Sequence, residues 1–109
     1  MSMDAVFRAV ADKSRRALLD RLREKGGQSL GELCSGLAMT RQAVTKHLAI
    51  LEAANLVSTR KEGRKKLHFL NPVPIHELAA RWIDKFGRAR LDVLRELKRE
   101  LEQTQEEEK

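Results

Sequence analysis

The sequence contains one cysteine, Cys34, no tyrosine, and only 4% aromatic residues. A lone cysteine excludes a disulfide within the chain. No apolar run has the length of a membrane span or of a signal-peptide core. Because 41% of the residues are hydrophobic and few of these are aromatic, we expect an aliphatic core built from helices. These absences predict a cytoplasmic protein, mainly α-helical, with no membrane partner.

Sequence signatures of catalysis are also missing. There is no glycine-rich phosphate loop and no paired-carboxylate motif. The histidines at positions 47 and 68 have no aspartate or serine beside them that suggests a catalytic triad. We therefore expect a protein that is not an enzyme and that uses no cofactor.

Positive charge is concentrated in one part of the chain. The net charge is +6, and residues 40–70 contain seven lysines and arginines but only two acids. This segment therefore carries a charge of +5. A local excess of cations favours a polyanionic partner, and double-stranded DNA is the partner we expect.

Residues 30–54 are predicted to form two short amphipathic helices joined by a tight turn. Ser29 stands three residues before Glu32, which is the spacing of a capping box at the start of a helix. Thr40 is expected to cap the second helix. The apolar residues of that helix recur at helical spacing and predict one buried stripe: Val44, Leu48 and Leu51.

The opposite face of the second helix has the side chains that a DNA-reading helix needs. Arginine pairs with guanine, glutamine with adenine, threonine with phosphate or a thymine methyl, and lysine with phosphate. The histidine is interpreted either as a packing residue or as a phosphate donor. A solvated polar face is the alternative, which the neighbouring positive charge disfavours. The predicted DNA-binding residues of this helix are Thr40, Arg41, Gln42, Thr45, Lys46 and His47.

A β-hairpin is predicted after this pair of helices. Residues 56–60 and 65–70 have roughly alternating patterns typical of strands, and a connection with Gly63 joins them. The tip and the adjoining strand ends are basic. We expect the hairpin to contact the DNA backbone through Arg60, Lys61, Arg64 and Lys65.

Two further helices are predicted before residue 30. Residues 3–11 have apolar positions at helical spacing, and Asp12 or Ser14 can cap the helix that follows. Gly26 and Gly27 are expected to end this second helix, because glycine adopts the left-handed conformation that closes a helix.

The C-terminal third is predicted to be one long helix beginning near Ile75, after two prolines that interrupt regular structure. About 28 residues of helix, with a possible kink at Gly87, would span roughly 42 Å, too long for so small a domain to cover. A second chain would cover the excess, although a helix folded back on its own domain is the alternative. The expected homodimer interface comprises Val6, Phe7, Ile75, Leu78, Trp82, Phe86, Leu91, Leu94 and Leu97. We expect a single domain over residues 1–102 and a frayed acidic tail over residues 103–109.

Several segments together resemble the ArsR family of winged helix-turn-helix repressors. The resemblance implies a mainly α fold with a small β-hairpin, a homodimer formed by the terminal helices, a recognition helix beginning at Thr40 and a wing on the flanking backbone. It also implies repression at an operator, often in the protein's own promoter. The segments that carry it are FRAVAD at 7–12 with Arg15, Arg16, Leu18 and Leu19; LGEL at 30–33; QAVTKHLAIL at 42–51; and Leu56-Val57 with Glu62-Gly63-Arg64.

The chain departs from the metal-sensing members of that family. Their Cys-x-Cys pair corresponds here to Cys34 and Gly36, so the second thiolate is absent. Their Asp-x-His pair is missing, and the terminal helix offers only His76. We therefore expect no metal site and interpret Cys34 as a small buried apolar residue.

Two alternatives remain open at this stage. One is a metal-responsive repressor with unrecognised ligands. The other is a winged helix that binds proteins, which the polar face of the recognition helix disfavours. The sequence identifies no small-molecule effector.

Overall fold

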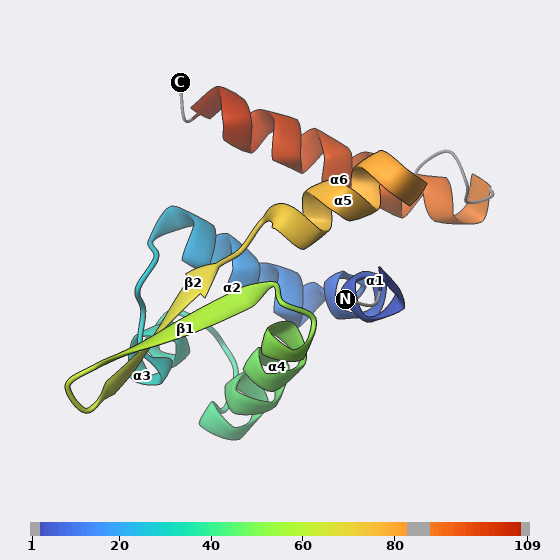
Figure 1. Ribbon diagram of the computed structural model, residues 1–109. Coiled ribbons are helices and arrows are strands. Elements are labelled where there is room, and N and C mark those ends of the chain that lie inside the picture. The colour runs from blue at the N-terminus through green and yellow to red at the C-terminus, as the bar shows by residue number, and fades with distance from the viewer. Residues whose placement is uncertain (1–2, 83–87, 108–109) are drawn as a thin grey trace. The chain divides into compact units, whose positions relative to one another are not determined.

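The computed structural model describes residues 3–82 and 88–107 of a chain that forms two compact units, Met1–Asn71 and Pro72–Lys109 (Figure 1). The first unit contains α1 (Met3–Val10), α2 (Lys13–Glu24), α3 (Leu30–Ser35), α4 (Arg41–Ala53), β1 (Val57–Glu62) and β2 (Lys65–Leu70). The second unit contains α5 (Val73–Trp82) and α6 (Arg88–Glu107). The predicted fold class, helices with one small β-hairpin, is confirmed.

Helices α3 and α4 have the caps that the sequence predicted, and of the two predicted candidates for α2 the structure uses Asp12 and not Ser14. The Asp12 carboxylate caps α2 by accepting from the Arg15 amide at 2.9 Å. Ser29 and Glu32 form the complete capping box of α3. The Thr40 hydroxyl caps α4 by accepting from the backbone N–H of residue 43 at 3.0 Å. Each cap satisfies a backbone donor that the first turn of a helix leaves without a partner.

The ends of α2 and α4 use the left-handed conformation differently. Asn55 has φ 61° directly after the cap of α4, as a residue that closes a helix does. Helix α2 instead ends at Glu24, its capping residue Lys25 has an extended backbone, and the left-handed residue is Gly27, with φ 76°. Helix α2 and its capping residue therefore stop directly before the two predicted glycines, but the helix is not closed by a left-handed residue next to its cap. The ring of Phe69 packs closely over both glycines.

The core of the first unit is aliphatic. Helix α2 packs against α4 and β2, while α1 and α3 pack against α4. The predicted stripe of α4 is buried, and it meets apolar side chains from the other helices of the unit. The fully buried side chains of the unit include Val6, Val10, Leu18, Leu33, Val44, Leu51 and Leu56.

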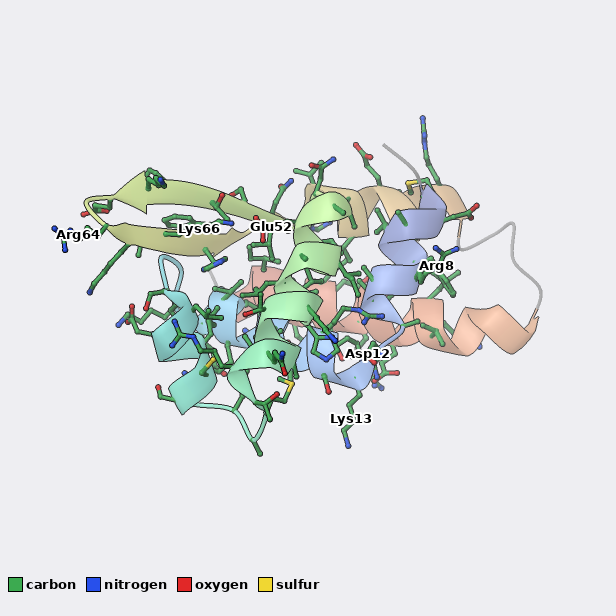
Figure 2. The ribbon with its side chains drawn as sticks, turned by 90° about the horizontal axis from the view of Figure 1, so that it is seen from below. Arg8, Asp12, Lys13, Glu52, Arg64 and Lys66 are labelled. Carbon is green, nitrogen blue, oxygen red and sulfur yellow. The ribbon has the colours of Figure 1, made fainter. Side chains whose placement is uncertain are left out.

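The hairpin is antiparallel, pairing Val57 with Leu70 at its base and Glu62 with Lys65 at its tip. Gly63 has φ 64° in the turn, a conformation that glycine adopts without strain. The hairpin projects from the helices in both views (Figures 1 and 2).

A buried polar contact fixes the base of the hairpin. The imidazole Nδ1 of His68 lies 2.8 Å from the Gln28 carbonyl oxygen, which also accepts from the His68 amide at 2.9 Å. Because a carbonyl only accepts, His68 carries its proton on Nδ1. The Gln28 side chain in turn donates to the carbonyls of Arg21 and Lys25 at the end of α2. Both buried polar residues, Gln28 and His68, therefore have hydrogen-bond partners.

The second unit corrects the prediction for the C-terminal third. Helix α5 begins at Val73, two residues before the predicted start, because a proline such as Pro74 is tolerated in the first turn of a helix. Helices α5 and α6 pack against each other, so the prediction of one long helix is wrong. Helix α6 reaches Glu107 and so includes most of the segment for which a frayed tail was expected.

Most residues of the expected dimer interface have a determined burial. Val6, Ile75, Leu78, Leu94 and Leu97 are buried within the single chain, and Phe7 is half-buried. Phe86 lies outside the described residues, as do the side chains of Trp82 and Leu91. The buried members of this set are therefore already covered in the single chain and do not need a second chain to cover them.

In the parts of the chain that the structure describes, no helix combines the length and the apolar character that crossing a membrane requires.

Candidate nucleic-acid interface

Helix α4 presents its polar side chains on the side opposite its buried stripe. Arg41, Gln42 and Lys46 are exposed, while Val44, Leu48 and Leu51 are buried. Within residues 3–82 and 88–107, no hydrogen bond or ion pair engages any of those three polar side chains. They can therefore form new contacts without losing existing ones.

The two threonines of this helix have local hydrogen bonds. The Thr40 oxygen accepts the capping bond, and the Thr45 hydroxyl donates to the Arg41 carbonyl at 2.9 Å. Both side chains are exposed. With its proton donated to that carbonyl, the exposed Thr45 side chain still has oxygen lone pairs that can accept a hydrogen bond and a methyl group that can contact thymine.

His47 differs from the other predicted residues of α4 because it is half-buried and contacts another helix. Its Nδ1 atom lies 3.4 Å from Nη1 of Arg15 in the first turn of α2. Asp12 lies beside this pair, at the junction of α1 and α2 (Figure 2). The backbone hydrogen bond from Arg15 is the main cause that lowers the pKa of Asp12, and the positive charge of Arg15 lowers it further. The Asp12 carboxylate is therefore ionised at neutral pH.

The hairpin has two faces with different cations. Residues opposite each other across the strands share a face, so Lys61 and Lys66 lie on the face of the buried His68. Arg60 and Lys65 lie on the other face. All four of these side chains are exposed.

Helix α4 and the hairpin are joined by an ion pair. The Lys66 Nζ atom lies 3.2 Å from Oε1 of Glu52, and the two side chains point toward one another (Figure 2). Lys66 is not among the site residues predicted from the sequence, because nothing in the strand pattern shows which cation of the hairpin faces Glu52.

Arg60 is held on the opposite face of the hairpin. Its guanidinium carbon lies 5.1 Å from the centroid of the Phe69 ring, and its Nη2 lies 3.7 Å from Oε2 of Glu62. Stacking on an aromatic ring restrains an arginine without neutralising its charge. Arg64 is exposed at the tip of the hairpin (Figure 2).

The structure thus places the predicted residues in two adjoining groups. One group lies on the exposed side of α4, and the other lies along the hairpin, which packs against α4 through β1. Arginine and glutamine on a helix can read base edges in the major groove, and cations on a projecting hairpin can hold phosphates. This is a surface that can both read and hold duplex DNA.

Cys34 belongs to no group of candidate metal ligands in the part of the chain that the structure describes. Cys34 is a half-buried free thiol on α3. Among the described residues, no group of three or more histidine, cysteine, aspartate or glutamate side chains is arranged to hold a metal ion.

Comparison with known proteins gives matches over most of the chain. Residues 10–60 match the helix-turn-helix domain family. The chain is 38% identical over 87 residues to the uncharacterized HTH-type transcriptional regulator YuzN of Bacillus subtilis, covering 74% of this chain and 95% of that protein. It is 29% identical over 96 residues to the arsenical resistance operon repressor of Escherichia coli, covering 88% and 81% of the two chains.

A solved structure agrees with these sequence matches. The ArsR-like transcriptional regulator from Rhodococcus sp. RHA1 superimposes with a TM-score of 0.70 at 30% sequence identity. The match covers 93% of this chain and 91% of that one. The similarity therefore includes most of both compact units.

Proposed function

Since this chain belongs to the ArsR family of winged-helix transcriptional regulators, we propose that it represses transcription by binding an inverted-repeat operator as a homodimer. It is a DNA-binding transcriptional regulator, and its family is not enzymatic. We also propose which residues contact DNA, that the protein is a homodimer, and that its operator is an inverted repeat. The proposed place of action is the cytoplasm.

The observation that carries the proposal is the exposed face of α4. A helix whose buried stripe fixes it to the core presents Arg41, Gln42 and Lys46 to solvent without internal partners among the described residues. We assign base reading to this face, with Thr40, Thr45 and His47 at its edges. An arginine or a glutamine in the first turn of a recognition helix is placed to reach base edges.

The hairpin is proposed as the part that holds the DNA backbone. Arg64 at its tip and Lys61 and Lys65 beside the tip are exposed, and the turn carries them away from the helices. Arg60 is part of the same proposed surface, although its stacking on Phe69 limits its reach. Cations arranged in this way neutralise phosphates without reading sequence.

A homodimer is proposed because one recognition helix covers only a short half-site. Two copies related by a two-fold axis would present two α4 helices to the same side of the duplex, which doubles the recognised sequence. We propose that the dimer interface is formed by Phe7 on α1 and by the second unit. The buried members of the predicted set would pack under the residues that make the contacts. The operator would then have half-site centres about 10 to 10.5 bp apart, or a multiple of that spacing.

The test is selection of bound fragments from the genomic DNA of the source organism, followed by footprinting of the enriched sites. We expect enrichment of an inverted repeat, with the gene's own promoter as the first site to inspect for autorepression. Enrichment of direct repeats or of single half-sites would contradict the symmetric dimer. Uniform recovery of all fragments would contradict sequence-specific repression.

A further inference from the structure

Arg15 joins three elements through one guanidinium group. Its Nε donates to the Ala9 carbonyl at 2.8 Å and its Nη2 to the Arg8 carbonyl at 3.1 Å, both at the end of α1. Its Nη1 lies 3.4 Å from Nδ1 of His47 on α4. Arg15 itself belongs to the first turn of α2. A single side chain therefore ties the end of α1 to the proposed recognition helix.

The direction of the contact with His47 fixes the tautomer of the imidazole. A guanidinium has no acceptor, so Nδ1 of His47 must accept and the neutral ring carries its proton on Nε2. Within the described part of the chain, no protein acceptor engages that Nε2–H group. His68 provides the contrast, since its Nδ1 donates to a backbone carbonyl.

The position of His47 on α4 lets its Nε2–H group reach bound DNA. His47 directly follows Lys46, which is exposed, and precedes Leu48, which is buried, so it lies at the edge of the DNA-facing side. A half-buried ring held on one nitrogen has fewer orientations to lose when its other nitrogen binds a ligand. Asp12, which accepts from the Arg15 amide, places a negative charge beside the guanidinium.

We propose that Arg15 is a positioning residue, which orients His47 so that its Nε2–H donates to a backbone phosphate oxygen of bound duplex DNA. This inference rests on the proposed DNA-binding function. It also makes the end of α1 part of the support of the recognition helix, because Arg8 and Ala9 hold the guanidinium that holds the ring.

Arg16 offers a matched control for Arg15. Its Nη1 donates to the Val10 carbonyl at 2.9 Å, so it also bonds the end of α1 from the first turn of α2. This bond does not involve His47. Arg15→Ala and Arg16→Ala remove the same charge and the same kind of bond to α1, but only the first removes the contact with the ring.

The experiment measures affinity for a duplex operator in a double-mutant cycle. We expect Arg15→Ala to weaken binding about tenfold relative to Arg16→Ala, and we expect this excess to fall below about twofold in the His47→Ala background. Arg15→Lys provides a second variant in case Arg15→Ala unfolds. It keeps the charge, but one ammonium cannot hold two carbonyls and a ring nitrogen together, so a loss of several-fold is expected.

Nitrogen NMR of the imidazoles tests the positioning role without DNA. In the neutral form, His47 is expected to be protonated on Nε2 and His68 on Nδ1, so the two rings give opposite signals in one spectrum. Arg15→Ala or Arg15→Lys should move only the His47 signals toward those of an exposed imidazole, and Arg16→Ala should leave both rings unchanged.

The two measurements separate the possible failures. If the His47 signals do not respond to loss of Arg15, or if the affinity losses of Arg15→Ala and His47→Ala multiply as independent effects, the positioning role is wrong. If the wild type binds no duplex DNA while its His47 signals still depend on Arg15, the contact exists but both the phosphate contact and the proposed function are wrong.

Discussion

The Nζ atom of Lys66 on β2 lies 3.2 Å from the Oε1 atom of Glu52 on α4. The pair joins the two elements that we propose to contact DNA, and it places a carboxylate at their junction. Lys66 is about half exposed, at 53%, and Glu52 is 29% exposed, so water screens the pair. Its electrostatic effect on bound DNA should therefore exceed its effect on stability.

Glu52→Gln should lower the free energy of unfolding by less than about 1 kcal/mol, as expected for a solvent-screened ion pair. The same change should tighten binding to any duplex, because it removes a negative charge from the basic surface and releases Lys66. Thermal unfolding and titration of a scrambled duplex measure the two effects. Glu24→Gln, which removes the same charge from the last turn of α2, is the control. Equal tightening by both variants would show that only net charge matters.

Gln42→Ala should weaken the preference of the protein for its operator over other DNA sequences. A lost bidentate contact to a base costs about 1 to 3 kcal/mol at the true operator and much less on a scrambled duplex. Titration of both duplexes provides the measurement. An equal loss on both would mean that Gln42 contacts the backbone.

Arg64→Ala should weaken binding to DNA of any sequence. A lost phosphate contact weakens binding to both duplexes by similar factors and lowers the slope of log affinity against log salt by about one. Titrations across a range of salt concentrations, with Gln42→Ala as the comparison, test this. A change in sequence preference in Arg64→Ala would mean that the hairpin, and not α4 alone, recognises the base sequence.

Asp12 should make the stability of the first unit depend on pH in acid. The Arg15 amide holds the pKa of Asp12 below its ordinary value of 3.8 in the folded state. The contribution of the ionised cap is therefore present above that ordinary value and is lost as the pH falls through the folded-state pKa. Asp12→Asn keeps a capping oxygen but no charge, so the difference in stability between the wild type and this variant should shrink as the pH falls below the ordinary value of 3.8 and through the folded-state pKa.

Asp12→Ala completes this comparison. It removes the cap at every pH and should cost about 1 kcal/mol near neutrality. Chemical denaturation at a series of pH values measures all three proteins. A constant difference between wild type and Asp12→Asn across the acid range would show that the charge of Asp12 does not stabilise α2.

Ending the chain at Asn71 should yield a monomer with weak operator affinity. The first unit retains its own core, and Asn71 keeps its bonds to the carbonyls of Leu56 and Asn55. Loss of the second half-site contact should weaken binding on the order of 100-fold. Sedimentation gives the assembly state, and circular dichroism confirms that the helices remain. If the shortened chain stayed dimeric with unchanged affinity, the dimer interface would have to be formed by α1 around Phe7.

The features that sequence analysis predicted well depend on neighbours in the chain. The caps at Asp12, Ser29 and Thr40 each bind a donor three residues away, so their spacing is visible in the sequence. The buried stripe of α4 and the two strands follow from periodicity for the same reason.

The features that it missed depend on distant parts of the chain. The contact of Arg15 with His47 spans 32 residues, and the pairing of Lys66 with Glu52 depends on the register of the hairpin. The packing of α5 against α6 is likewise tertiary, because the apolar spacing of a long helix and of two packed helices is the same. Periodicity shows which residues are buried but not which surface covers them.

The bond between the Gln28 carbonyl and the His68 ring closes a loop of 40 residues. That loop contains all of α3, α4 and β1. Helix α4 presents the side chains proposed to read DNA, and α3 and β1 pack against it. Closing such a loop carries an entropic cost that is recovered only when its contents are folded. The hairpin base and the recognition helix should therefore open and close as one cooperative unit, with the amides of Gln28 and His68 exchanging with solvent only when that whole unit opens.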